Sequence, residues 1–378
     1  MYAERMNRVK HKELREVIML AYERQISLFI WGTTGIGKSY TVRETAKELA
    51  RRIGRPNFVE WNRLTYDEKL KVYNEPEKYF VLIDIRLSQV DASDVRGLPK
   101  LNERHVVWKP PLWLDFCTKR QARGIVFLDE LNLAPPTIQA SAYQLILDRS
   151  LGEYAIADGI GVIGAGNRLE DRANVFEMPK PLQNRFIHVE LMIPTAEEWI
   201  ENFAIPNKLD SRIIMFIQKR PSLLFKFNPK SKDERFPTPR SWEFASKLIK
   251  GIPTERLEWI GKLVAMAVGD GASAEFVSFL KFYERLPDIK LLIQGKAEVP
   301  QEPDLLYVLT AQIVEYFRNH KDEKTLRGLA KNVLAKMPDE FAILSLKMMK
   351  SEDEKTIRST AKLPEWRPLY MKFLKYLL

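Results

Sequence analysis

Residues 27–39, Ser-Leu-Phe-Ile-Trp-Gly-Thr-Thr-Gly-Ile-Gly-Lys-Ser, decide the fold of this protein. The first five are mostly apolar and predict a buried strand. The last eight, Gly32–Ser39, follow the pattern G-x-x-x-x-G-K-S, which is the phosphate-binding P-loop. Beyond the loop, apolar residues recur at helical spacing: Val42, Ala46, Leu49 and Ile53. The pattern therefore stands in the strand–loop–helix context that it requires, and it predicts binding of a nucleoside triphosphate.

Each position of the loop has an expected role. The glycines allow positive φ, so that several backbone N–H groups point at one phosphate chain at a helix N-terminus. Lys38 is expected to reach the β- and γ-phosphates, and Ser39 is expected to hold Mg²⁺. The predicted nucleotide-binding residues are Gly32, Thr33, Thr34, Gly35, Ile36, Gly37, Lys38, Ser39 and Tyr40.

The composition is that of a globular chain. Hydrophobic residues make up 45% of the 378 residues and charged residues 29%, which is enough apolar material for a large core in two or three domains. The chain has neither an apolar stretch of about 18 residues nor an apolar segment after its charged N-terminus. We therefore expect no membrane span and no secretory signal.

Cysteine and histidine content excludes two kinds of site. A single cysteine, Cys117, rules out an intrachain disulfide and favours a cytoplasmic location. The four histidines are far apart in sequence and lack zinc-ligand spacing. The net charge of +10 is compatible with nucleic acid or an acidic partner, but 60 basic and 50 acidic residues are mixed throughout. A surface covered by ion pairs explains the charge equally well.

Five apolar segments predict a parallel β-sheet covered on both faces by helices. They are residues 27–31, 79–85, 125–128, 160–165 and 185–191. A helix is expected over residues 4–24. After Pro194 the pattern is helical and is interrupted by prolines. We therefore predict three regions: an α/β nucleotide-binding domain over 1–194, a helical lid over 195–286 and a helical region over 287–378.

Two carboxylates, Asp129 and Glu130, directly follow the predicted strand 125–128. At the carboxyl end of a central strand they would lie beside the P-loop. Asp129 would then hold Mg²⁺, often through water, and Glu130 would polarise the attacking water. Acidic residues often follow a strand, so this assignment depends on the P-loop that precedes it.

Three other polar residues are candidates for the same site. Asn167 ends the next predicted strand, where an amide can orient water or contact the γ-phosphate. Arg185 precedes the last strand and is expected to serve the nucleotide of a neighbouring subunit. Arg240 follows two prolines at a helix start and could contact phosphate from the helical domain. The alternatives are that Asn167 is only a turn residue, that Arg185 forms a surface ion pair and that Arg240 only lies at a helix start.

Together these motifs resemble the AAA+ ATPases, and within them the MoxR-like branch, also called the helix-2-insert clade. The matching residues are Gly32–Ser39 (Walker A), Leu128–Glu130 (Walker B), Asn167 (sensor 1), Arg185 (arginine finger) and Arg240 (sensor 2). Three stretches carry the resemblance to the MoxR-like branch. They are Asp94–Pro99 at the place of the insert, Leu131–Pro136 after Walker B, and Arg149–Asp158, which resembles a β-hairpin before sensor 1.

The resemblance implies a five-stranded parallel P-loop sheet followed by an all-α lid and a C-terminal helical segment. It also implies hydrolysis of ATP with Mg²⁺ at the subunit interfaces of a homo-oligomeric ring, usually a hexamer. The implied catalytic residues are Lys38, Glu130, Asn167, Arg185 and Arg240, and the implied metal ligands are Ser39 and Asp129. Family members remodel proteins as chaperones, often with a partner that carries a von Willebrand A domain. Whether Arg240 serves its own nucleotide or a neighbour's stays open.

Three other functions compete with this interpretation. Asn207–Asp210 matches the guanine-reading N-K-x-D of GTPases, but Asp129 is not followed by the glycine of D-x-x-G, and Asp210 is expected to cap a helix. A nucleic-acid motor could use the segment Trp108–Trp113, although a loop that packs on the domain or contacts a partner protein is favoured. The third alternative is a scaffold that binds ATP and hydrolyses it very slowly.

Overall fold

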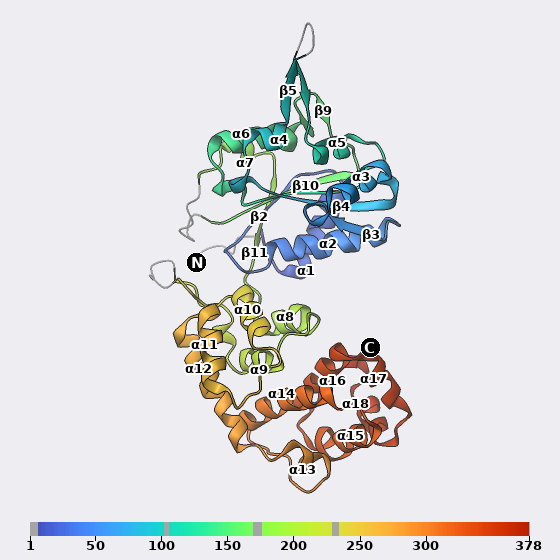
Figure 1. The fold of residues 1–378 in the computed structure, drawn as a ribbon, viewed down its shortest axis with the longest axis vertical. Coiled ribbons are helices and arrows are strands. Elements are labelled where there is room, and N and C mark those ends of the chain that lie inside the picture. The colour runs from blue at the N-terminus through green and yellow to red at the C-terminus, as the bar shows by residue number, and fades with distance from the viewer. Residues whose placement is uncertain (1–6, 102–105, 169–175, 229–233, 378) are drawn as a thin grey trace. The chain divides into compact units, whose positions relative to one another are not determined.

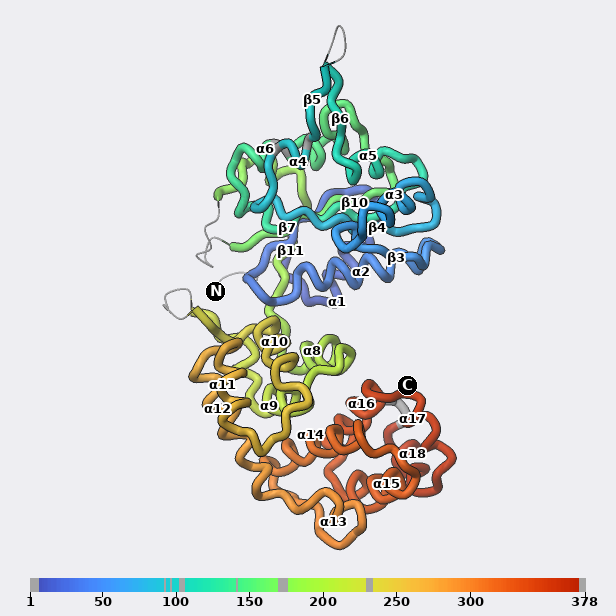
Figure 2. Tube along the Cα trace, viewed as in Figure 1, coloured from blue at the N-terminus to red at the C-terminus, as the bar shows by residue number. Residues whose placement is uncertain are grey.

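The computed structural model describes residues 7–101, 106–168, 176–228 and 234–377. Within it the chain forms two compact units, Met1–Ile193 and Pro194–Leu378. The first contains a β-sheet with helices on its faces, and the second is built from helices (Figures 1 and 2). Each unit is described by itself.

The first unit is organised around a seven-stranded sheet in the order β1-β11-β2-β10-β7-β4-β3, and all paired strands are parallel. The strands are β1 (Arg8–Val9), β2 (Leu28–Trp31), β3 (Asn57–Glu60), β4 (Tyr79–Arg86), β7 (Gly124–Asp129), β10 (Ile160–Gly166) and β11 (Ile187–Leu191). Since β10 lies between β2 and β7, the segments that follow these three strands meet at one edge of the sheet.

The parallel sheet is confirmed, but the expected number of five strands is wrong. The two additional strands, β1 and β3, lie at opposite edges. β1 has two residues and β3 has no fully buried residue, so neither shows a run of apolar residues. The helix expected over 4–24 begins later, at His11, because Arg8 and Val9 pair with Glu190 and Leu191.

Helices cover both faces of this sheet (Figure 1). Helices α1 (His11–Glu23) and α2 (Lys38–Arg52) pack on one face, and α5 (Leu112–Thr118) and α6 (Pro136–Leu147) on the other. Both faces of β7 are apolar as a consequence: Val126 and Leu128 pack in the core with α6, while Ile125 and Phe127 alternate with them and are equally buried. The remaining helices of this unit are α3 (Tyr66–Asn74), α4 (Ala92–Arg96) and α7 (Lys180–Gln183).

Two hairpins extend from this unit. The strands β8 (Ser150–Leu151) and β9 (Tyr154–Ala155) are antiparallel, which confirms the hairpin expected within 149–158. The strands β5 (Leu98–Leu101) and β6 (Val106–Lys109) form a second, longer hairpin. The loop expected over Trp108–Trp113 is therefore wrong: Trp108 belongs to β6, and α5 begins at Leu112.

In the second unit the described residues form helices and connecting segments without a strand. The helices are α8 (Ala196–Trp199), α9 (Ser211–Lys219), α10 (Pro239–Ile249), α11 (Leu257–Val268), α12 (Asp270–Leu280), α13 (Ile289–Ile293), α14 (Pro303–Asn319), α15 (Glu323–Gly328), α16 (Asp339–Glu352), α17 (Glu354–Ser359) and α18 (Arg367–Leu377). One hydrophobic core runs from Ala196 to Phe373, so that residues before and after position 286 share it. None of the helices in the described ranges combines the length and the apolar composition that a membrane span needs.

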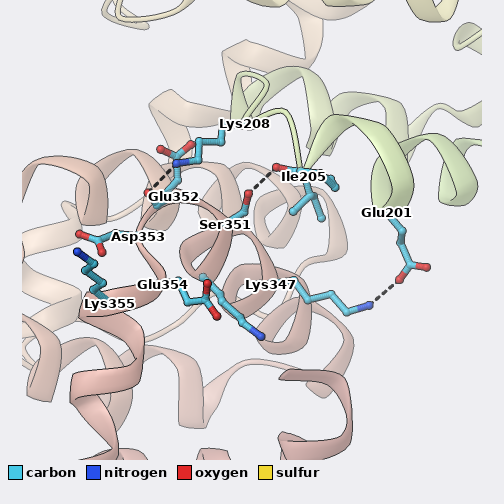
Figure 3. Close-up of a pocket in the computed structure, with 11 residues that line it drawn as sticks. Glu201, Ile205, Lys208, Lys347, Ser351, Glu352, Asp353, Glu354 and Lys355 are labelled. Atoms are coloured by element: carbon cyan, nitrogen blue, oxygen red, sulfur yellow. Dashed lines mark hydrogen bonds and ion pairs between the residues drawn. The ribbon is translucent and has the colours of Figure 1, made fainter. Parts of the chain in front are cut away.

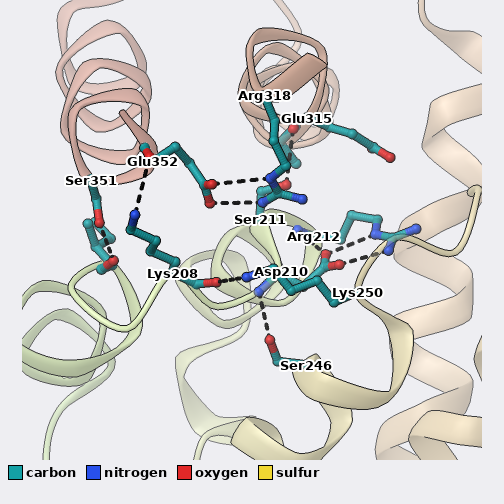
Figure 4. Close-up of polar contacts among 12 residues, drawn as sticks. Lys208, Asp210, Ser211, Arg212, Ser246, Lys250, Glu315, Arg318, Ser351 and Glu352 are labelled. Atoms are coloured by element: carbon teal, nitrogen blue, oxygen red, sulfur yellow. Dashed lines mark hydrogen bonds and ion pairs between the residues drawn. The ribbon is translucent and has the colours of Figure 1, made fainter. Parts of the chain in front are cut away.

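A buried ion pair organises the start of α9 (Figure 4). The side chain of Asp210 caps the helix by accepting from Arg212 N, and its second oxygen lies 2.8 Å from Arg212 Nη2. Arg212 also donates to the carbonyls of Ile249 and Ile252, and Ser246 Oγ accepts from Asp210 N. The expected helix cap at Asp210 is confirmed, and its carboxylate is occupied by structural contacts rather than offered to a base.

Candidate functional site

The P-loop connects β2 to α2 at the edge of the sheet where the parallel strands end. Gly35 and Gly37 have φ values of 79° and 100°, which L side chains rarely adopt, so glycine is required at both positions. Gly32 N donates to Gly166 O over 3.3 Å, which ties the loop to the end of β10. The loop leads directly into the N-terminus of α2, where backbone N–H groups favour an anion.

Lys38 lies within this loop with only 9% of its surface exposed. Its Nζ donates to Gly32 O at 2.5 Å, to Thr33 O at 3.0 Å and to Asn167 Oδ1 at 3.1 Å. An ammonium group has three donors, so these acceptors use all of them. The fold thus brings together Lys38 and Asn167, which are 129 residues apart in the sequence.

Ser39 and Asp129 meet directly, because Ser39 Oγ donates to Asp129 Oδ2 over 2.8 Å. A hydroxyl and a carboxylate this close are a suitable oxygen pair for Mg²⁺, which takes one or two protein ligands and completes its shell with water and substrate phosphates. A buried carboxylate oxygen of Asp84 has no hydrogen-bond partner among the described residues. The residues present therefore fit a hard divalent cation.

Glu130 follows Asp129 in the left-handed region, with φ 55° and ψ 32°. A non-glycine residue in this conformation costs on the order of 1–2 kcal/mol, so the surrounding contacts must hold it there. Glu130 N donates to Asp129 Oδ1 over 2.9 Å, and Ser88 Oγ donates to Glu130 Oε2 over 2.6 Å. The two carboxylates therefore have different partners, Ser39 for Asp129 and Ser88 for Glu130. No sequence pattern had singled out Ser88.

Asn132 is a second residue that sequence reasoning did not assign to the site. Its side chain makes two hydrogen bonds with the backbone of Asn167: Nδ2 donates to the carbonyl at 2.7 Å, and Oδ1 accepts from the N–H at 3.1 Å. Both asparagines are buried. A Cβ on Gly166 would lie 2.3 Å from Asn132 Oδ1, so the glycine makes room for this clamp. Asn132 therefore fixes the backbone that presents the Asn167 amide.

Asp84 is a third such residue, and it lies on β4 beside the strand that ends in Asp129. Burial, together with the negative charge of Asp129, raises the pKa of Asp84 to about 6. Its backbone is fixed by Asn62, which donates to Asp84 O and accepts from Asp84 N. A carboxylate within the otherwise apolar segment 79–85 was the signal that could have singled it out.

We expect Asp84→Asn to stabilise the protein at pH 8 and to change little at pH 4, without Mg²⁺ or nucleotide. The folded-state pKa lies above the unfolded value of about 3.9. The contribution of protonated Asp84 to the free energy of unfolding is therefore complete below pH 4, and it is lost as the pH rises through about 6. Asparagine stays neutral, so its advantage grows to about 1–2 kcal/mol by pH 8, with allowance for partial exposure.

Urea unfolding at the two pH values measures this difference. The exposed Asp148, which follows α6, provides the control Asp148→Asn, which removes a carboxylate from the surface of the same unit. An Asp84→Asn protein that gained nothing between pH 4 and pH 8 would contradict the expected electrostatic cost of the buried carboxylate.

Arg185 is not among the residues that meet at the P-loop. Its Nη1 lies 2.5 Å from both Tyr143 Oη and Pro181 O, and its guanidinium stacks over the Tyr143 ring at 4.6 Å. Arg240 belongs to the second unit, where it is exposed as the second residue of α10. Tyr40 is half-buried in the first turn of α2.

Two other residues complete the description of this unit's candidates. His11, at the start of α1, has its Nε2 2.8 Å from Ile36 O, so the N-terminal segment contacts the P-loop. No sequence pattern indicated this contact. Cys117 is fully buried, and burial raises the pKa of its thiol well above its usual range. A thiol that stays protonated in the core is inert.

The second unit contains a large open pocket of about 810 Å³ (Figure 3). It lies between the segment Glu201–Lys208 and the segment Lys347–Lys355. Lys347 pairs with Glu201 at 2.5 Å, and Lys208 Nζ donates to Glu352 O at 3.2 Å. Four lysines and four acidic residues line the pocket, so their formal charges balance. Nothing in this lining favours a particular ligand, and the candidate site remains the P-loop edge of the first unit.

Comparison with known proteins gave matches only among solved structures. No protein-family profile and no curated protein matches the chain. Among the similar structures is NtrX from Brucella abortus in complex with ATP, at 12% identity and a TM-score of 0.35 over 97% of this chain and 68% of that one. Another is the RuvB Holliday junction branch migration motor of Thermotoga maritima, at 14% identity and a TM-score of 0.28 over 82% of this chain and 75% of that one.

A third similar structure is PCH-2 from C. elegans, at 14% identity and a TM-score of 0.31 over 73% of this chain and 67% of that one. All three structures are AAA+ ATPases. Similarities at these identities and scores do not assign the chain to a family. The functional argument therefore rests on the residues of the site.

Proposed function

We propose that this protein is an AAA+ ATPase that hydrolyses ATP. The observation that carries the proposal is the meeting of five side chains at one edge of the sheet. Lys38 contacts Asn167, and Ser39 contacts Asp129. Glu130 follows Asp129 in the chain, and its carboxylate is held by Ser88. These are the groups that phosphoryl transfer to water requires: a phosphate cradle, a metal-ligand pair, a base and an orienting amide.

The roles follow from the chemistry of each side chain. The loop N–H groups and Lys38 bind the β- and γ-phosphates, and Asn167, already beside Lys38, orients the attacking water. Glu130 accepts the proton of that water as the new bond to γ-phosphorus forms and the bond to the ADP oxygen breaks. Ser39 and Asp129 would hold Mg²⁺, which neutralises charge on the phosphates when it is bound.

The preference for ATP over GTP is supported by Asp210. A guanine-reading aspartate must offer its carboxylate to the base, but both carboxylate oxygens of Asp210 accept hydrogen bonds from Arg212. The segment Asn207–Asp210 also lies in the second unit, at a helix start. The match to N-K-x-D is therefore best explained as a helix cap.

We further propose that the enzyme works as a homo-oligomeric ring, with six subunits as the expected number. Among the residues that the structure describes, Arg185 is bound to Tyr143 and Pro181 and not to the P-loop edge of its own subunit. Its guanidinium is proposed to stabilise charge on the nucleotide of the next subunit. Residues 195–286 would serve as the lid that brings Arg240 to phosphate, and residues 287–378 would extend it.

The proposed output is that of the MoxR-like branch: remodelling of a protein partner, for which a von Willebrand A domain protein is the first candidate. The β5–β6 hairpin supports this choice of a protein, since it lies at the place of the branch's insert and exposes Leu98, Leu101 and Trp108. A nucleic-acid partner is less well supported, because only two lysines, Lys100 and Lys109, lie on these two strands.

The test is ATPase rate against protein concentration, with mass measured by light scattering with and without ATP. We expect the rate per subunit to rise with concentration and the mass to rise on addition of ATP, because each site would need the neighbour's arginine. The Glu130→Gln protein should form the same assembly with strongly reduced turnover. A constant rate per subunit from a monomer would remove Arg185 from the mechanism and leave a stand-alone nucleotide switch.

A further inference from the structure

We propose that His188 positions the loop that carries Arg185 and connects this loop to the strand that leads into the P-loop. The inference rests on the proposed function, because it concerns how the interfacial arginine is held. His188 lies on β11, three residues after Arg185, and its ring is half-buried. Both ring nitrogens are used, each by a different segment of the chain.

The partners of His188 fix its protonation. Trp31 Nε1 lies 3.0 Å from His188 Nδ1, and an indole nitrogen can only donate. Nδ1 must therefore be the acceptor. His188 Nε2 lies 2.7 Å from Gln183 O, and a carbonyl can only accept, so Nε2 carries the proton. His188 is held as one neutral tautomer that bridges Trp31 to Gln183.

One end of this bridge, Gln183, lies two residues before Arg185 in the chain. Gln183 ends α7, and the segment that follows is closed by hydrogen bonds from Arg185 N to Leu182 O and from Phe186 N to Gln183 O. The Arg185 side chain returns to the same helix at Pro181 O. Fixing the carbonyl of Gln183 therefore fixes the turn from which the guanidinium projects.

On the other side the bridge reaches the P-loop. Trp31 is the last residue of β2, and the next residue, Gly32, accepts from Lys38 Nζ. The Trp31 and His188 rings are also nearly parallel, with centroids 6.0 Å apart and planes 22° apart. A continuous path thus leads from Lys38 through Gly32, Trp31 and His188 to the Arg185 turn.

Apolar contacts also hold the Arg185 turn against β2, but they constrain its orientation less than hydrogen bonds do. Phe186 contacts Phe29 of β2 with ring centroids 5.3 Å apart. Ring packing keeps the Arg185 turn close to β2, whereas the two hydrogen bonds of His188 set its orientation along the strand. Loss of the hydrogen bonds alone should therefore leave the fold intact and misplace the guanidinium. A misplacement of about 1 Å can cost about 100-fold in rate.

The first experiment compares three substitutions in the full-length protein. His188→Phe keeps a ring and removes both hydrogen bonds, and we expect kcat to fall by about 10- to 100-fold with KM for ATP changed less than about threefold. His188→Gln, which can accept and donate at similar positions, should recover most of the rate. Trp31→Phe removes a single donor and should give an intermediate loss. His320→Phe, at an exposed histidine of the second unit, is the matched control.

The second experiment tests where the defect lies. His188→Phe subunits keep their own P-loop and Glu130, so they should regain activity when mixed with Glu130→Gln subunits, which supply an intact Arg185. Arg185→Ala subunits mixed with Glu130→Gln subunits provide the reference for complementation. Thermal unfolding of each variant, expected within a few degrees of wild type, reports whether the fold is kept.

The two proposals fail in different ways. If the Arg185→Ala mixture does not regain activity, the interfacial role of Arg185 is wrong, and the proposed ring mechanism with it. If that mixture regains activity but the His188→Phe mixture does not, His188 acts elsewhere than on the arginine, and the inference is overturned. Equal rates for His188→Phe and wild type would overturn it as well, as would a His188→Gln protein no better than His188→Phe.

Discussion

Glu130→Gln is expected to bind ATP as tightly as the wild-type protein while turnover falls by about 10³-fold. Glutamine has the size of glutamate and can accept from Ser88 Oγ, so the contact that holds the side chain survives. Its amide is not a base and does not take the proton of the attacking water, a role that contributes about 10²- to 10⁴-fold in enzymes. The nucleotide affinity should not change, because Lys38 and the loop N–H groups are untouched.

Single-turnover hydrolysis of ATP, together with equilibrium binding of a fluorescent ATP analogue, separates the two effects. Glu153→Gln is the matched control, since Glu153 is an exposed carboxylate in the β8–β9 turn of the same unit. It should leave both quantities unchanged. Normal turnover by Glu130→Gln would show that another group takes the proton, and the other carboxylates of this edge, Asp129 and Asp84, would then have to be tested.

Arg185→Ala is expected to lower the hydrolysis rate by about 10³-fold or more, with nucleotide affinity retained. A guanidinium that stabilises charge on the transferred phosphoryl group contributes about 10³- to 10⁵-fold in related chemistry. The proposal attributes this loss to the nucleotide of a neighbouring subunit, because the described contacts of Arg185 are with Tyr143 and Pro181. Arg185→Lys keeps the charge but loses the planar fork of donors, and we expect it to restore little.

Mixing experiments decide whether Arg185 acts on its own nucleotide or on a neighbour's. Arg185→Ala subunits should regain part of their activity when Lys38→Ala subunits are added, because the latter lack a working P-loop but present an intact arginine. Absence of rescue at every mixing ratio would count against the geometry across subunits. Thermal unfolding of Arg185→Ala controls for the loss of the Tyr143 contact, which should shift the midpoint only slightly.

The main strands were predictable because each is buried on both faces. Segments such as 79–85 and 125–128 are continuous apolar runs, and in a parallel sheet that is covered by helices every residue of a central strand needs an apolar neighbour. The edge strands β1 and β3 lack this signal. Arg8 and Val9 form a strand only because Glu190 and Leu191 lie beside them, and two residues contain no periodicity of their own.

The residues of the site likewise divide into those that a local pattern predicts and those that only the fold brings together. The P-loop and the carboxylates Asp129 and Glu130 are local patterns, since their chemistry depends on residues that are adjacent in the chain. Asn132 also lies in a segment that the resemblance picked out, but nothing local showed that it holds Asn167. The contact is made across 35 residues, and only the fold brings the two together.

The sequence by itself determined that a nucleoside triphosphate site lies between a strand and a helix, because backbone conformation at Gly35 and Gly37 and the reach of Lys38 are properties of one short segment. Tertiary structure alone decided which distant groups act on that segment. The parallel order of β2, β10, β7 and β4 places Asn167, Asp129 and Asp84 at one edge, and β11 places His188 against Trp31. Pairing between strands is set by the packing of whole faces, which no single stretch of the chain encodes.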